Sequence, residues 1–252
     1  MNKTIALACL AMLGAAVPSA AGPTQLVTNG GFEQTNMSDP SGFGNRYAAG
    51  VVNGWSGDGL IGIYFPGTAE TGTTTEYGYR DFKVYGPGNG HPNGLPATSP
   101  MGGNFVVLDG DTSPALRGLI AQQISGLSAG AKYTVSFWFA GAQQLNFGGA
   151  THSKFLDVSL GGETQRTEAL AGPEGSFQAW RKVAMTFTAA STTETLSFLA
   201  HGQPNGLPPL VLLDGVSMTS AVPEPTTWAM LITGFALVGA ASRRRRMAEV
   251  AA

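Results

Sequence analysis

The strict alternation of apolar and polar residues over 131–140 is the strongest constraint on what this chain can fold into. Successive side chains of a strand point to opposite faces, so this segment has one face suited to burial. That face carries four apolar residues, Tyr133, Val135, Phe137 and Phe139. A similar alternation over 182–188 marks a second strand, and further candidates lie at 104–108, 119–124, 155–160, 195–200 and 210–218.

Turn-forming residues separate these segments. The chain contains 36 glycines and 15 prolines among 252 residues. No segment between the two ends has apolar residues at helical spacing over three turns. Many short strands with glycine-rich turns are typical of sandwiches and jelly rolls. We therefore expect an all-β domain, a single β-sandwich or jelly roll, in which 39–103 forms early strands with long loops.

Composition excludes several classes of protein. Charged residues make up 12% of the chain, about half the usual share, while the 43% of apolar residues are enough for one sizeable core. A formal net charge of −2 gives no basic surface, so we expect no nucleic-acid partner. The single cysteine, Cys9, excludes a disulfide framework and a thiolate metal cluster.

Residues 1–21 have the pattern of a secretory signal peptide. Lys3 provides the positive start, an apolar stretch follows over 5–17, and Pro18 precedes a small-residue cleavage signal that ends at Ala21. We expect cleavage after Ala21, which makes residues 22–221 the exported domain.

A second signal occupies residues 222–246. Pro223, Glu224 and Pro225 precede Trp228 and Ala229, an apolar run continues to 242, and four arginines follow, Arg243, Arg244, Arg245 and Arg246. Arginines at the end of a membrane helix favour the cytoplasmic side. We expect a C-terminal transmembrane helix in the inner membrane, with residues 247–252 as a cytoplasmic tail.

This string resembles the PEP-CTERM sorting signals of Gram-negative bacteria, in the variant with Trp-Ala after Pro-Glu-Pro. In that family the short motif, the helix and the arginine cluster follow one another in the order seen here. The resemblance implies that an exosortase recognises the segment and cleaves near Pro223. The protein would then be anchored transiently before it reaches the cell surface or the extracellular space.

The exported domain resembles carbohydrate-binding modules with the galactose-binding-like jelly-roll fold. The resemblance rests on the opening 26–33 (LVTNGGFE), Gly54-Trp55, the turn at 126–134 (GLSAGAKYT) and 213–216 (LDGV). In such modules the first and last strands lie side by side, and an acidic residue from each holds a structural calcium. The matching residues here are Glu33 and Asp214. The alternative is that Glu33 is an ordinary turn acid and Asp214 caps a strand end.

A glycan-binding face is expected around Trp138, which alternation places opposite the core residues of its strand. An exposed tryptophan on a sheet is costly to hydrate unless a ligand or a loop covers it. Gln143 and Gln144 follow in the same strand, and Gln122 and Gln123 are further candidates for a polar-aromatic groove. Tyr77 and Tyr79 are weaker, loop-borne candidates. The alternative is a second packing layer in which loops fold over Trp138.

No catalytic motif stands out in the sequence. There is no Gly-x-Ser-x-Gly elbow, no His-Glu-x-x-His and no phosphate loop, and His91, His152 and His201 stand apart in or beside loop-like segments. We therefore expect a non-catalytic module that binds exopolysaccharide. The alternative is a structural matrix protein with protein–protein contacts alone, and an enzyme that acts on glycosides ranks third because it needs two opposed carboxylates.

Overall fold

The computed structural model describes residues 24–37, 41–42, 52–71, 83–221, 234–235 and 237–239. Three sets of predicted residues lie outside the described part of the chain. They are the signal peptide with its cleavage site at Ala21, the loop tyrosines Tyr77 and Tyr79, and the sorting residues Pro223–Pro225, Trp228, Ala229 and Arg243–Arg246. Residues 234–235 and 237–239 are helical. Within the described part of the chain, no helix has the length and apolar character needed to cross a membrane.

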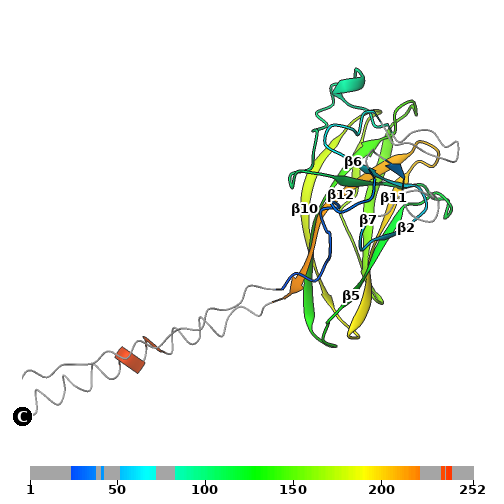
Figure 1. Cartoon of the computed structure of the whole chain (residues 1–252). Coiled ribbons are helices and arrows are strands. Elements are labelled where there is room, and N and C mark those ends of the chain that lie inside the picture. The colour runs from blue at the N-terminus through cyan, green and yellow to red at the C-terminus, as the bar shows by residue number, and fades with distance from the viewer. Residues whose placement is uncertain are drawn as a thin grey trace, which may run out of the picture.

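The fold is a sandwich of two antiparallel sheets, as the alternation predicts (Figure 1). The first sheet has the strand order β1-β3-β4-β12-β6-β10, and the second has the order β2-β5-β11-β7-β8, with β9 also paired to β7. The strands are β1 (Ser41–Gly42), β2 (Ser56–Asp58), β3 (Ile61–Tyr64), β4 (Phe105–Asp109), β5 (Leu119–Ser125), β6 (Lys132–Gln143), β7 (Thr151–Leu160), β8 (Glu163–Arg166), β9 (Leu170–Gly172), β10 (Gln178–Thr188), β11 (Thr193–Gln203) and β12 (Pro209–Ser220), and a 3-10 turn spans Pro87–Asn89.

The main core lies between the sheets and contains the residues that alternation assigned to it. Phe137 of β6 is fully buried and meets Phe198 of β11 edge to face, with ring centroids 5.2 Å apart. Trp55 packs tilted against Phe198 at 6.2 Å. Burying such a side chain stabilises the fold by about 1.5–3 kcal/mol, so this inter-sheet cluster holds the two layers together.

A second apolar cluster covers part of the outer face of the first sheet. Tyr64 and Phe105 meet at 5.5 Å, and Trp180 packs edge-on against Phe105 at the same distance. The outward-facing Ala140 and Ala142 of β6 are buried beneath this layer, which includes Leu60, Ala69, Val84 and Leu95. The irregular region before β4 therefore serves as a cover for the sheet, which explains its scattered apolar residues.

The N-terminal segment runs alongside the last strand. The Leu26 amide donates to the Met218 carbonyl at 2.9 Å, and the Val216 amide donates to the Gly30 carbonyl at 2.8 Å. A side chain at Gly30 would collide with the Val216 carbonyl, so this close approach requires glycine. The register of β12 shifts between Asp214 and Ser217, where Gly215 has φ of 60°.

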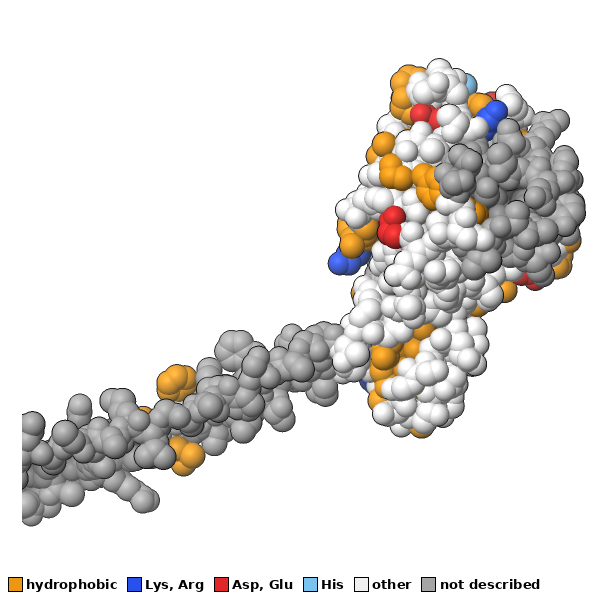
Figure 2. Space-filling model, viewed as in Figure 1, with side chains coloured by type: hydrophobic (Ala, Val, Ile, Leu, Met, Phe, Trp, Pro, Cys, Tyr) orange, Lys and Arg blue, Asp and Glu red, His pale blue; other side chains and the backbone are white. Residues whose placement is uncertain are grey.

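Surface charges are sparse. On the face drawn in Figure 2, the few acidic and basic side chains are scattered among polar and backbone atoms and form no large patch of one sign. This agrees with the 12% of charged residues in the sequence.

Candidate functional site

Four side chains form a cluster on the outer face of the second sheet, here called the second-sheet cluster: Phe155, Asp157, Arg166 and His201. Strand register places them together, because His201 lies opposite Phe155 and Arg166 lies opposite Asp157. Their immediate neighbours Leu156, Val158 and Ala200 are fully buried and point into the core. Alternation therefore turns the four cluster residues outward.

The centre of the cluster is a stack of rings. The His201 imidazole lies parallel to the Phe155 ring, with centroids 4.8 Å apart and planes 7° from parallel. The Arg166 guanidinium lies 4.2 Å from the Phe155 ring centroid. Such cation–π and stacking contacts restrict all three side chains, so the cluster forms a fixed platform.

Asp157 ties the platform together through charge. It accepts hydrogen bonds from Arg166 Nε at 2.7 Å and from Arg166 Nη2 at 2.9 Å. Its Oδ2 also lies 3.0 Å from His201 Nε2. The hydrogen bond from Arg166 lowers the pKa of Asp157, against an opposing effect of burial. Burial lowers the pKa of His201, which makes its imidazole neutral at neutral pH.

Small polar side chains surround the platform. Register pairs Ser153 with Gln203 and Ser159 with Ser197 on the same face of β7 and β11. Side-chain exposures of 16% for Asp157 and 59% for Arg166 leave polar atoms within reach of a ligand, whereas His201 Nε2 is buried. Since His201 and Arg166 both lie against the Phe155 ring, the surface offered to a ligand is that of the whole stack. This surface, beside a carboxylate and hydroxyls, matches the needs of a sugar ring, which has an apolar face and polar edges.

The prediction that Gln143 and Gln144 line a groove with Trp138 is wrong, because both glutamines are buried. Gln143 is 1% exposed, and its amide donates to the carbonyls of Phe147 and Gly149 and accepts from the Gly175 amide. Gln144 is also buried. These glutamines sit in the interior because loops fold over the end of β6.

Gln122 and Gln123 belong to the second sheet, so they lie in a different layer from Trp138. The Gln122 amide is engaged with main-chain groups of Thr28 and Gly54. Trp138 itself remains half-buried on the outer face of the first sheet, beyond the covered alanines, with Asp214 and Lys182 as its neighbours across the strands.

Glu33 and Asp214 come together at one corner of the first sheet, the arrangement that a shared calcium requires. A side chain at Gly31 would lie 3.9 Å from both Asp214 Oδ1 and Glu33 Cγ. Burial and, less strongly, the charge of Glu33 raise the pKa of Asp214 to about 7, although hydrogen bonds from the Ser99 hydroxyl and the Gly215 amide oppose this. Glu33 accepts from the Asn104 amide at 2.7 Å.

Two carboxylates that repel each other suit a hard cation. Among the described residues no three His, Cys, Asp or Glu side chains gather, so main-chain, hydroxyl or amide oxygens would complete the coordination. Calcium at this corner stays a prediction.

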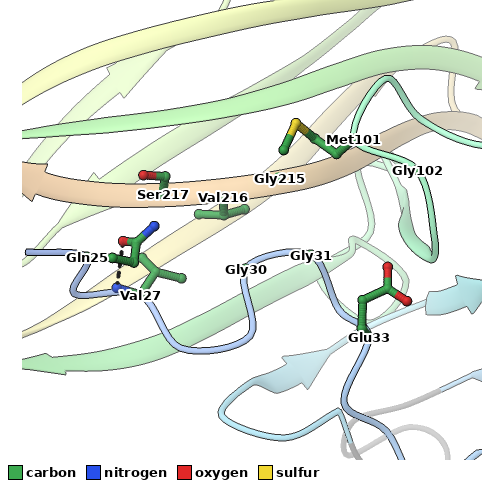
Figure 3. Close-up of a pocket in the computed structure, with 10 residues that line it drawn as sticks. All are labelled: Gln25, Val27, Gly30, Gly31, Glu33, Met101, Gly102, Gly215, Val216 and Ser217. Atoms are coloured by element: carbon green, nitrogen blue, oxygen red, sulfur yellow. Dashed lines mark hydrogen bonds between the residues drawn. The ribbon is translucent and has the colours of Figure 1, made fainter.

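A pocket of about 350 Å³ opens at the same corner (Figure 3). It lies between the N-terminal segment and β12, with Met101 and Gly102 contributed by a third segment. Its full lining is Gln25, Val27, Gly30, Gly31, Glu33, Met101, Gly102, Gly215, Val216 and Ser217. We call it the corner pocket.

Sequence reasoning missed Phe155, Asp157 and Arg166 as ligand candidates and placed His201 beside a loop, whereas it lies within β11. A signal was present. Phe155, Asp157 and Ser159 alternate with Leu156, Val158 and Leu160, which assigns an aromatic ring and a carboxylate to the outer face of one strand. What the sequence could not supply is the pairing of β7 with β8 and β11.

Comparisons with known families give two matches. Residues 95–207 match the family model described as a carbohydrate binding domain, and residues 221–246 match the model of the PEP-CTERM protein-sorting motif. No curated protein matches the chain. The first match includes all four residues of the second-sheet cluster.

Similar solved structures include three with sugar-related descriptions. TmCBM61 in complex with β-1,4-galactotriose has 14% identity and a TM-score of 0.37, with 78% of this chain and 99% of that chain covered. The CBM22-1 xylan-binding domain of Paenibacillus barcinonensis Xyn10C has 11% identity and a TM-score of 0.35, with 80% and 97% covered. A sugar-binding protein, the EclA C-terminal domain, has 15% identity and a TM-score of 0.30, with 39% of this chain and 64% of that chain covered.

The PEP-CTERM motif indicates export and sorting to the cell surface. The chain therefore carries a carbohydrate-binding module domain over residues 95–207 and a PEP-CTERM sorting motif over residues 221–246.

Proposed function

We propose that this protein is an exported, non-catalytic polysaccharide-binding protein that uses the second-sheet cluster as its main binding surface. After exosortase cleavage near Pro223 it would leave the inner membrane and act at the cell surface or in the exopolysaccharide matrix. The observation that carries this proposal is the stack of His201 on Phe155, held by Asp157 and Arg166 on an outer face. The carbohydrate binding domain match over 95–207 supports it.

The cluster suits binding better than catalysis. Its one carboxylate, Asp157, is held by Arg166 at 2.7 Å, and this hydrogen bond lowers its pKa. A general acid for glycoside cleavage needs the opposite, a raised pKa that keeps a proton available. The cluster therefore supports recognition of a sugar through stacking and hydrogen bonds to its hydroxyls.

The alternative, a structural matrix protein with protein contacts alone, makes a different prediction for the same surface. Affinity electrophoresis of the purified protein in gels containing β-1,4-galactan, xylan, β-1,3-glucan or alginate separates the two. Retardation by at least one polysaccharide, lost in Phe155→Ala and kept in Phe155→Tyr, supports the proposal. No retardation of the folded wild-type protein by any of the four, together with self-association or capture of matrix proteins, favours the alternative.

A further inference from the structure

The corner pocket lies on the first sheet, on the opposite side of the sandwich from the second-sheet cluster. Glycines give it its shape. Gly30, Gly31, Gly102 and Gly215 leave the main chain bare along its walls, and a side chain at Gly215 would press against Met101 and lie 3.3 Å from Trp138 Cδ1. The volume of about 350 Å³ exceeds that of one pyranose ring.

An exposed apolar side chain stands at the pocket. Met101 is 62% exposed, which is unusual for a large apolar residue in this domain. Its main chain is fixed, because the Met101 amide donates to the Ser99 hydroxyl, which in turn donates to Asp214. A flexible, polarisable side chain that starts from this fixed main chain, near the half-buried Trp138, provides an apolar contact surface for a ligand.

Polar groups line the other side of the pocket. Glu33 contributes a carboxylate whose direction is fixed by the Asn104 amide at 2.7 Å, and Ser217 contributes a hydroxyl from β12 (Figure 3). An apolar wall facing a fixed carboxylate matches one sugar ring, with its C–H face on Met101 and its hydroxyls on Glu33 and Ser217.

We infer that the corner pocket is a second carbohydrate site, which takes a single pyranose residue independently of the second-sheet cluster. Since the two sites face away from each other across the sandwich, one domain can hold two polysaccharide chains at once. The bridging role rests on the proposed function, whereas binding at the corner pocket itself does not.

The test follows each site by its own NMR signals, in buffer containing a calcium chelator, so that Glu33 is free to accept from sugar hydroxyls. The purified protein is titrated with D-galactose, D-xylose, D-glucose and N-acetyl-D-glucosamine, while the Met101 methyl and Trp138 indole signals report on the pocket. At least one of these sugars is expected to move both signals. Met101→Ala is expected to raise the Kd read from the Trp138 indole at least about tenfold. Glu33→Gln is expected to raise it several-fold, because an acceptor for sugar hydroxyls is weakened.

The variants also separate this inference from the proposed function. Phe155→Ala should leave the Trp138 titration unchanged, and Met101→Ala should leave the ring signals of Phe155 responsive to sugar. If none of the four sugars moves the Met101 and Trp138 signals while Phe155 still responds, the second site does not exist and the proposed function stands. If the pocket responds to a sugar while none of the four polysaccharides retards the wild-type protein, the proposed function falls and the pocket remains. Met101 is exposed, so its loss should not unfold the domain, which a melting curve checks.

Discussion

The imidazole of His201 lies flat against the ring of Phe155, although the two residues are 46 positions apart in the sequence. Antiparallel pairing of β7 and β11 sets them directly opposite each other, and Asp157 contacts His201 from the same face. The stack therefore depends on the register of two central strands, which makes it a rigid part of the fold and a suitable base for a binding surface.

Arg166 should matter for binding in a way that a similar surface arginine does not. Arg166→Ala removes the guanidinium from the Phe155 ring and the hydrogen bonds to Asp157, so we expect a several-fold weaker affinity for the polysaccharide. Arg181→Ala is the matched control, because Arg181 belongs to β10 of the first sheet and forms an exposed ion pair with Glu168. Equal losses in the two variants, measured by affinity electrophoresis, would contradict a role for Arg166 in the site.

The pKa of Asp157 should change in the same Arg166→Ala variant. In the wild type the Arg166 hydrogen bond is the largest cause of its lowered pKa. A carboxyl whose pKa is lower in the folded state than in the unfolded state stabilises the protein at pH values above its unfolded pKa. This stabilisation is lost as pH falls through the folded pKa. NMR titration should show the pKa of Asp157 rising in Arg166→Ala, with stability lost earlier on acidification. An unchanged titration would show that the bidentate contact is not present in solution.

Asp214 should link stability to pH and calcium. Its pKa is raised to about 7, above the unfolded value, so the folded state holds a proton that the unfolded state has released between about pH 4 and pH 7. This contribution to stability is present below the unfolded pKa and is lost as pH rises through about 7. Without calcium, Asp214→Asn should gain stability relative to the wild type as pH increases across this window.

Calcium should reverse that trend in the wild type, because a carboxylate binds the ion once it is deprotonated. We expect calcium to raise the wild-type melting temperature more at about pH 8 than at about pH 5, and Glu33→Gln to reduce this shift. If a chelator leaves the melting temperature unchanged at about pH 8, no calcium site exists at this corner.

Lys154 should lower the stability of the domain. It is fully buried on the core side of β7, its ammonium donates to the Thr151 hydroxyl at 2.7 Å, and burial lowers its pKa to about 8. Lys154→Met should raise the free energy of unfolding by about 1–2 kcal/mol at neutral pH. The gain should shrink as pH rises from about 8 to above the unfolded pKa, since the unfolded lysine then also loses its proton. A denaturant titration that finds Lys154→Met less stable at neutral pH would contradict this.

The sorting segment gives a prediction that is independent of the glycan sites. Replacing Pro223, Glu224 and Pro225 with alanine should prevent exosortase cleavage and leave a longer chain in the membrane fraction. Intact mass and cell fractionation measure both effects. Replacement of Thr226 and Thr227 with alanine is the matched control, which should be processed normally. An unchanged mature mass and location in the triple variant would contradict processing at this motif.

The strands that the sequence predicted well are those whose inward residues are mostly apolar. In β6 the alternation of Tyr133, Val135, Phe137 and Phe139 matches their burial in the core. The start of β7 was missed because Lys154 occupies a core-facing position and interrupts the apolar pattern. Short strands such as β8 and β9 leave too few residues for alternation to be recognised.

The candidate site was less predictable because it depends on contacts between distant segments. Proximity of Glu33 and Asp214 followed from a family resemblance, and the structure brings them to one corner. The burial of Gln143 depends on loops at 147–149 and 175, whose paths the sequence does not specify. The second-sheet cluster needed the pairing of three strands, so its residues looked unrelated in the sequence.

Isothermal titration calorimetry of Phe155→Ala against wild type, with a polysaccharide that retards the wild-type protein, tests the central claim most directly. The account predicts a rise in Kd of at least about tenfold, with Phe155→Tyr close to wild type and the melting temperature little changed. An affinity in folded Phe155→Ala equal to that of the wild type would contradict the claim that this protein binds glycans through the second-sheet cluster.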